Sequence, residues 1–117
     1  MIAPEVQQLL EHCPFLEPYV RDDMDLPVLA FGSVARIIIN NNGLSDDEED
    51  RVFAYFNKLA SIGTPRDLDV LGTGAVELFN DDEASQRLAR TKLDGAALQM
   101  LEDFRQGWGQ PDYSRAQ

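Results

Sequence analysis

The chain has 117 residues, with 21 Asp and Glu against 10 Lys and Arg, so its formal net charge at pH 7 is −11. This length suits one domain with one core, and a 44% share of hydrophobic residues is ordinary for a soluble globular protein. So acidic a chain is repelled by nucleic acid phosphates and anionic lipid, which argues against direct binding to nucleic acid or membrane.

The single Cys excludes an internal disulfide and a cysteine-rich zinc site, and it fits a reducing cytoplasm. The N-terminal residues show neither the basic nor the apolar segment of a signal peptide. The longest mostly apolar run, Leu26 to Ile39, contains Pro27, Gly32 and Arg36 and is too short for a membrane span. We therefore expect a cytoplasmic protein.

Hydrophobic spacing predicts helices along the whole chain, beginning with a short one that has Pro4 in its first turn. Its apolar face consists of Val6, Leu9, Leu10 and Cys13. Pro14 interrupts this helix. A second short apolar stripe, which contains Pro18, consists of Phe15, Leu16, Tyr19 and Val20.

The segment from Val28 to Ile39 is apolar on nearly every side, which is typical of the central and most buried helix. The β-branched run Ile37 to Ile39 also fits a strand, but the whole run is long for an isolated strand, so a helix is preferred. Asn40 to Gly43 supplies residues that adopt the left-handed conformation at a helix C-terminus.

Ser45 and Glu48 have the spacing of a capping box, which predicts a helix that ends near Gly63. Its apolar face consists of Val52, Phe53, Phe56, Leu59 and Ala60. Thr64 and Pro65 then suit the N-cap and first residue of the next helix. The stripe of that helix consists of Leu68, Leu71, Ala75, Leu78 and Phe79.

Asn80 or Asp81 can cap another short helix that contains Ala84 and Leu88, and Asp94 can cap the last one. The last helix has Ala97, Leu101, Phe104 and Trp108 on its face and ends at Gly107, Gly109 and Pro111. The polar tail, residues 112–117, is expected to fray. The prediction is an all-α fold, a compact single domain over 1–117 of about six short helices around Val28 to Ile39.

Catalytic and metal-binding patterns are weak, so we predict no enzyme activity, no metal and no cofactor. His12 adjoins Cys13, but adjacent helical residues do not face each other, and Cys13 falls on an apolar face. Asp67 and Asp69 begin a poor calcium-loop match, because Leu71 and Leu78 stand where oxygen ligands belong. The pair Gly72 and Gly74 indicates close helix packing or, alternatively, close approach of a partner backbone.

Acidic residues occur in three dense runs. Helix capping accounts for part of them, but five acids in succession exceed what a cap needs. A surface that attracts a basic protein accounts for the excess, since complementary charge speeds association. The candidate contacts are Asp46, Asp47, Glu48, Glu49 and Asp50, followed by Asp22, Asp23 and Asp25 and by Asp81, Asp82 and Glu83.

The stretch from Asp67 to Asp81, DLDVLGTGAVELFND, resembles a segment of small acidic helical immunity proteins from bacterial polymorphic toxin systems. In those proteins an apolar helix with a Gly and an internal Glu precedes a short acidic turn. The resemblance implies a cytoplasmic protein that binds a cognate toxin tightly and blocks its active site or substrate entry. It makes Glu77 the internal acid and a further candidate contact.

The acidic surface extends this expectation to a basic toxin domain, such as a nuclease or another enzyme that acts on anionic nucleotides. One alternative is an acidic adaptor or nucleic-acid mimic that regulates some other basic protein. Two further hypotheses are an enzyme with a buried acid and a helical subunit whose charge serves only solubility. The free protein could be a monomer or a modest dimer.

Overall fold

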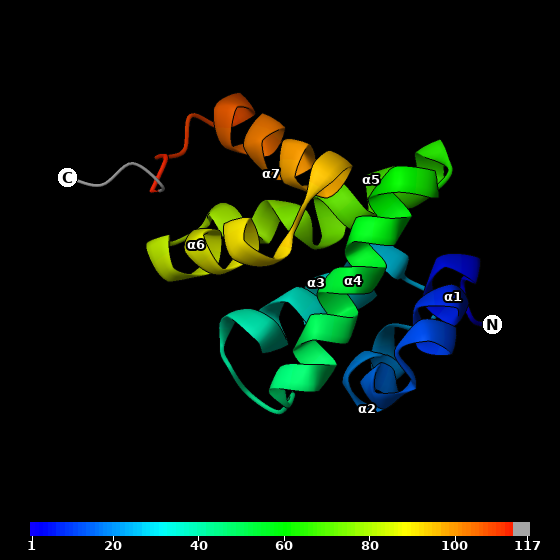
Figure 1. Cartoon of the computed structure of the whole chain (residues 1–117). Helices are drawn as coiled ribbons and strands as arrows, with labels where there is room; N and C mark the ends of the chain where they lie inside the picture. Colours follow the sequence, from blue (N-terminus) through cyan, green and yellow to red (C-terminus); the bar gives the residue numbers. More distant parts are fainter. Residues whose placement is uncertain (114–117) are drawn as a thin grey trace.

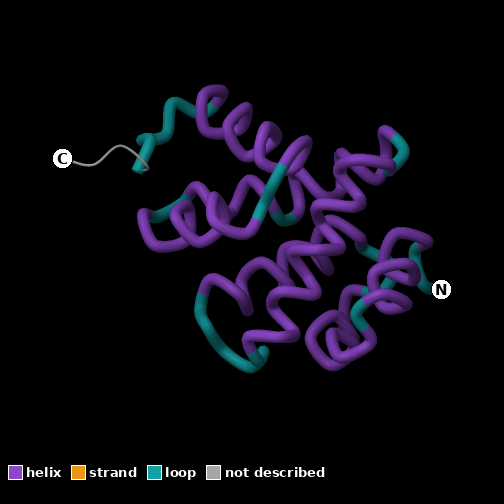
Figure 2. Tube along the Cα trace, in the orientation of Figure 1, coloured by secondary structure: helices purple, strands orange, loops and turns teal. Residues whose placement is uncertain are grey.

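The computed structural model describes residues 1–113, which form helices and loops and no strand (Figures 1 and 2). The α-helices are α1 Pro4–His12, α2 Glu17–Val20, α3 Pro27–Ile39, α4 Asp46–Ile62, α5 Pro65–Gly74, α6 Glu83–Lys92 and α7 Gly95–Gly107. Three 3₁₀ helices join them, namely η1 Pro14–Leu16, η2 Arg21–Asp23 and η3 Val76–Asn80. The predicted all-α single domain is confirmed.

The N-terminal elements are short because prolines punctuate them. Pro4 is at the start of α1, whose Val6 and Leu9 are buried together with Cys13 just beyond it. Pro14 begins η1, and Pro18 lies in the first turn of α2, where a missing N–H costs nothing. The predicted stripes are therefore present as separate short helices.

Helix α3 packs against α1, α2, α5 and η3, as a central helix should. Its buried face consists of Ala30, Phe31, Val34, Ala35 and Ile38. The apolar first turn of this helix is an exception to the predicted burial, because Val28 and Leu29 are 41% and 50% exposed. After the helix, Asn41 and Gly43 have φ of 50° and 119°, so the predicted left-handed stop is confirmed.

The long helix α4 begins at the predicted capping box. Ser45 Oγ accepts a hydrogen bond from the Glu48 N–H at 3.1 Å, and the Glu48 carboxylate accepts one from the Ser45 N–H at 2.9 Å. Phe53 and Phe56 on its buried face meet aromatic rings from α3 and η3. The ring centroids are 6.0 Å apart for Phe31 and Phe56, and 5.5 Å apart for Phe53 and Phe79. These rings form the centre of the core.

The prediction of a single amphipathic helix after Thr64 is wrong, because α5 ends at Gly74 and the chain continues as η3. At Gly74 an added Cβ would lie 2.9 Å from Phe31 Cβ and 2.9 Å from the Val28 carbonyl oxygen. At Gly72 an added Cβ would lie 2.8 Å from the Phe104 ring. Both glycines thus serve close packing within this chain, one of the two predicted roles.

The N-cap of α6 differs in position from the prediction, and the N-cap of α7 is the predicted residue but lacks the expected hydrogen bond. Asp82, one residue beyond the predicted Asn80 or Asp81, caps α6 by accepting a hydrogen bond from the Ser85 N–H at 2.8 Å. Asp94 occupies the N-cap of α7 without a side-chain hydrogen bond, and its own N–H donates to Asn57 of α4 instead. The start of α7 is therefore held to α4 by a backbone-to-side-chain contact.

The end of α7 also differs from the prediction, because Trp108 is 66% exposed and lies outside the core. The chain beyond it is not free at Asp112 and Tyr113. Gln86 Oε1 accepts a hydrogen bond from the Tyr113 N–H at 2.7 Å, and Arg90 pairs with Asp112 at 3.3 Å. The prediction of a fraying tail is thus wrong for Asp112 and Tyr113. The rest of the predicted tail lies outside the described residues.

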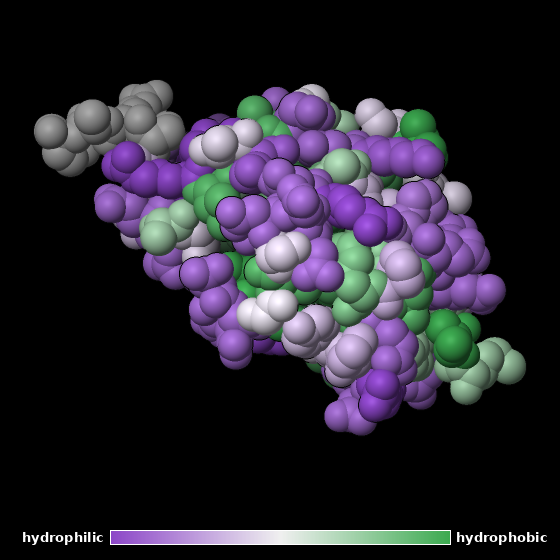
Figure 3. Space-filling model, turned by 60° about the horizontal axis from the view of Figure 1, so that its bottom comes forward, coloured by the Kyte–Doolittle hydropathy of each residue, from purple (hydrophilic) through white to green (hydrophobic). Residues whose placement is uncertain are grey.

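The molecule measures 46 × 30 × 21 Å, and its Cα radius of gyration is 13.4 Å, as expected for one compact domain of this length. The buried hydrophobic residues form one core in space, and its members range along the sequence from Val6 to Leu101. Exposed hydrophobic residues interrupt a mostly hydrophilic surface on the face shown in Figure 3. Within residues 1–113, no helix is long and apolar enough to cross a membrane.

Candidate functional site

A hollow of about 360 Å³ lies where the end of α3 meets the beginnings of α4 and α6. We call it the acidic hollow. Carboxylates from two of the predicted acidic runs line it, Asp46 and Glu49 from α4 and Asp82 from the N-cap of α6. Its apolar lining comes from Ile38, Ile39, Ala84 and Leu88, and Asn41 and Ser85 complete it. The fold has therefore joined two acidic segments that are far apart in sequence.

Local sequence explains why these acids lie at helix starts. The positive end of the α4 dipole stabilises carboxylates in its first turn, and this turn contains Asp46, Asp47, Glu48 and Glu49. Glu48 is turned back to the Ser45 N–H, so it serves the cap. Asp47 and Asp50 are exposed, whereas Glu49 is half-buried beside the hollow.

Burial and charge repulsion act together on Glu49. Burial raises the pKa of its carboxyl, the Lys92 ammonium lowers it, and the charges of Asp46 and Asp50 raise it further. A cationic side chain placed in the hollow would relieve this repulsion. The acidic hollow is thus chemically suited to an Arg or Lys of a partner.

Lys92 is the described cation that pairs with the run from Asp46 to Asp50, with 2.6 Å between its Nζ and Asp50 Oδ1. Arg51, the sequence neighbour of the run, instead donates a hydrogen bond to the His12 carbonyl at 3.0 Å and lies over the Phe15 ring. Arg51 therefore adjoins the acids in sequence but serves a different contact in space. No feature of the sequence indicated Lys92 at this place.

The other candidate acids lie elsewhere. Asp22 and Asp23 belong to η2, and with the exposed Asp25 they follow α2, which Figure 1 shows across α4 from α6. Asp81 and Glu83 flank Asp82 and are exposed like it, but they do not line the acidic hollow, and Glu83 pairs with Arg87 at 3.7 Å. Glu77 is half-buried on η3 and lines none of the hollows described here. The structure thus joins only two of the three acidic runs.

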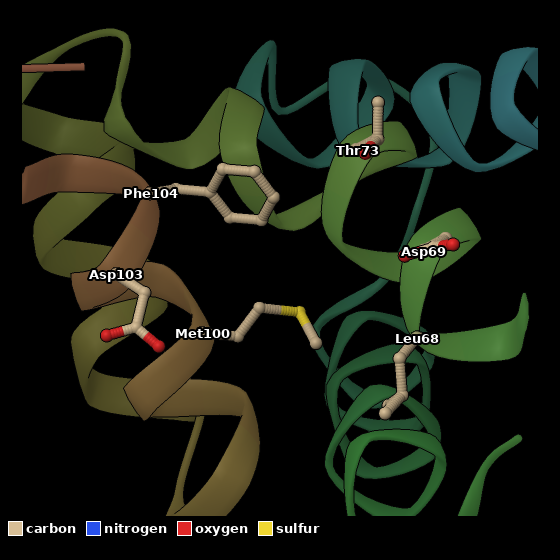
Figure 4. A pocket seen from close by; sticks show the side chains of 6 residues that line it. All are labelled: Leu68, Asp69, Thr73, Met100, Asp103 and Phe104. Atoms are coloured by element: carbon tan, nitrogen blue, oxygen red, sulfur yellow. The ribbon is translucent and has the colours of Figure 1, made fainter. Parts of the chain in front are cut away.

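A second hollow, of about 380 Å³, lies between α5 and α7 and was not predicted. Figure 4 shows Met100 and Phe104 extending from α7 toward α5, with Leu68 opposite. The exposed carboxylates of Asp69 and Asp103 and the Thr73 side chain also line it. Leu68 and Phe104 were predicted on apolar helix faces, but as core residues. This hollow adds a further apolar surface with an acidic rim.

The two residues weighed as a nucleophile and base have other partners. Cys13 Sγ is 3.8 Å from the Arg51 carbonyl oxygen, and burial raises the pKa of its thiol. His12 Nδ1 donates a hydrogen bond to the Gln8 carbonyl oxygen at 3.0 Å. Among residues 1–113, no group of three His, Cys, Asp or Glu side chains is placed to hold a metal ion.

Comparison of the chain with protein-family models, with curated proteins and with solved structures gave no match.

Proposed function

We propose that this protein is an immunity protein that binds a cognate bacterial toxin one-to-one and occludes its active site or substrate cleft. The observation that carries the proposal is the acidic hollow, where Asp46, Glu49 and Asp82 surround an apolar surface. A preformed concave surface with converging charges is the kind of feature that fixes a partner's orientation.

The apolar lining supplies affinity that charge alone does not. Long basic side chains have aliphatic stems, which would pack on Ile39 and Leu88 while the charged head reaches the carboxylates. Hydrogen bonds between ionised groups are among the strongest that proteins make. The hollow is therefore suited to an Arg or Lys near the centre of an interface.

The charge of the whole molecule suggests the class of target. A net charge of −11 steers the protein toward a basic surface and raises the association rate at low salt. Enzymes that act on nucleic acids or nucleotides need basic clefts to bind their anionic substrates. A nuclease or nucleotide-directed toxin domain is therefore the proposed partner.

The first test is co-expression of this protein with the product of the neighbouring gene. We expect the neighbour to be toxic alone, the pair to be tolerated and a stable complex to purify. If the neighbour is harmless and forms no complex, the immunity proposal is wrong. Binding to a basic protein unrelated to toxins would then favour the acidic adaptor or nucleic-acid mimic.

The second test locates the interface with two variants of equal charge change. Asp46→Asn, Glu49→Gln and Asp82→Asn together neutralise the acidic hollow, and an amide side chain at position 82 can still cap α6. Asp22→Asn, Asp23→Asn and Asp25→Asn remove the same charge from the far side of α4. We expect the first variant to lower the association rate about tenfold at low salt and the second to lower it far less. Equal effects would show that net charge, not the hollow, matters.

A further inference from the structure

A separate hollow of about 310 Å³ lies between α1 and the second half of α4 and is closed by the turn into α5. Its polar lining consists of Gln8, His12, Tyr55, Lys58 and Asp67, and Ile62 lines its apolar side. It shares no residue with the acidic hollow. Its size is at the lower end of small-molecule sites, so it can hold a small ligand such as an amino acid.

Tyr55 carries an unused hydrogen-bonding group at this hollow. Its side chain is almost fully buried, with 6% of the residue exposed, and its ring lies 4.6 Å from the His12 ring. Among the described residues none hydrogen bonds to the Tyr55 hydroxyl, and this oxygen is not itself buried, so it is accessible from the hollow. An acceptor on a bound ligand could take the place of water there.

Opposite charges also line the hollow. Most described cations form ion pairs, namely Arg21, Arg66, Arg87, Arg90, Lys92 and Arg105. Lys58, like Arg36 and Arg51, pairs with no described carboxylate, and its exposed side chain lines this hollow. Asp67 uses one oxygen to accept a hydrogen bond from the Thr64 N–H at 3.0 Å, which leaves its other oxygen for a ligand.

His12 adds an acceptor. Because its Nδ1 donates to the Gln8 carbonyl, the neutral ring has an unprotonated Nε2 with a free lone pair. The apolar wall is provided by Leu59 and by Ile62, whose side chain is 71% exposed. The hollow thus offers a cation and a hydroxyl donor, an anion and an acceptor, and an apolar surface.

We propose that this hollow binds a free α-amino acid with an apolar side chain. The ligand carboxylate would accept hydrogen bonds from Lys58 and Tyr55, and its ammonium would donate to Asp67 and His12 Nε2. Its side chain would pack on Ile62. A simple anion or amine meets only half of this arrangement, because Asp67 repels the first and Lys58 repels the second.

The test is a calorimetric or NMR titration of the folded protein with L-leucine and two analogues. The analogue 4-methylpentanoate lacks the ammonium group, and 3-methylbutylamine lacks the carboxylate. We expect leucine to bind and each analogue to bind at least about tenfold more weakly, the loss of one charge-assisted contact. Equal affinity for either analogue, or no leucine binding up to about 10 mM, would contradict the proposal.

Three variants assign the contacts. Lys58→Met, Tyr55→Phe and Asp67→Asn should each weaken leucine binding, and an amide side chain at position 67 can still accept the hydrogen bond from Thr64. Asp69→Asn, two residues further along α5 and outside this hollow, should leave leucine affinity unchanged. Tyr55→Phe is informative for folding, because it removes a hydroxyl with no described partner. If all three variants bind leucine as the parent protein does, the site is wrong.

Discussion

Buried polar residues decide much of the local structure, and they were the hardest residues to predict. Gln86 is fully buried on α6, and its amide donates hydrogen bonds to Asn80 Oδ1 at 3.1 Å and to the Pro111 carbonyl at 2.9 Å. Asn80 in turn donates to the Leu101 carbonyl at 3.0 Å. These contacts connect η3, α6, α7 and the segment after α7. Hydrophobic periodicity contains no signal for them, because polar residues are ordinarily exposed.

Replacing Gln86 with Ala should therefore destabilise the protein by at least about 2 kcal/mol, because buried acceptors at Asn80 and Pro111 lose their donor. Chemical denaturation followed by circular dichroism measures this loss. The control is Gln99→Ala on the exposed side of α7, where the amide donates only to Asp103. The control should change stability by no more than about 0.5 kcal/mol. Equal losses of stability for the two substitutions would show that the buried contacts of Gln86 do not stabilise the protein more than an exposed glutamine does.

At the scale of elements, the crossing of α3 and α5 depends on a small residue. An added Cβ at Gly74 would meet the Val28 carbonyl oxygen and Phe31 Cβ, both at 2.9 Å, and the backbone atom cannot rotate away. Gly32 on the opposite helix is also close, since its added Cβ would lie 3.2 Å from the Gly74 carbonyl oxygen. Helices α3 and α5 thus approach each other at a glycine on each helix, Gly32 of α3 and Gly74 of α5.

Gly74→Ala should cost about 1 to 3 kcal/mol, the usual penalty for overpacking. Gly107→Ala is the matched control, because its added Cβ would meet nothing within 4 Å at the end of α7. The control should be neutral or stabilising by up to about 1 kcal/mol, since Ala favours helix. Thermal unfolding of both variants compares them directly. A stable Gly74→Ala variant would show that the helices can move apart without loss.

An ionic network connects α6 to α7. Glu102 accepts hydrogen bonds from Arg90 at 2.9 Å, from Arg105 at 2.6 Å and from Gln106 at 3.0 Å. The bonds from Arg105, then those from Gln106 and Arg90, lower the pKa of Glu102 to about 2, although burial opposes them. The ionised form is therefore favoured in the folded state.

A lowered pKa sets the direction of the pH effect. The contribution of Glu102 to stability is complete above its ordinary pKa of 4.5 and is lost as pH falls toward about 2. Glu102→Gln should therefore be less stable than the parent at pH 7, and the difference should shrink across this window. Glu11→Gln, which removes an exposed carboxylate of the same kind, should show no such convergence. Thermal unfolding at a series of pH values tests this, and a constant difference for Glu102→Gln would contradict it.

At the scale of the whole molecule, charged side chains have different roles in different places. Many acids cap helices or pair with Arg and Lys, and Asp46, Glu49 and the α6 cap Asp82 also line one hollow. Lys58, which pairs with no described carboxylate, lies at a different hollow beside α1. One molecule thus has an acidic concave surface, the proposed site for a basic partner, and a mixed-charge hollow, the proposed site for a small zwitterion. The two proposals rest on different residues, so either can fail without the other.

The sequence by itself determined the helices, because the information is local. Apolar spacing in α4 and the pairing of Ser45 with Glu48 depend on residues three or four positions apart. The prolines and Asn41 with Gly43 determined where helices begin and end for the same reason. The acidic runs were also visible, since they are contiguous.

Only the tertiary structure decided which of these residues meet. Helix α5 ends at Gly74, where α3 lies against it, and Trp108 at the end of α7 is exposed. The acidic hollow unites α4 with α6, and Lys92, not Arg51, pairs with Asp50. The physical reason is that side chains distant in sequence meet only through packing, and the crossing of two helices depends on the shape of every residue between them.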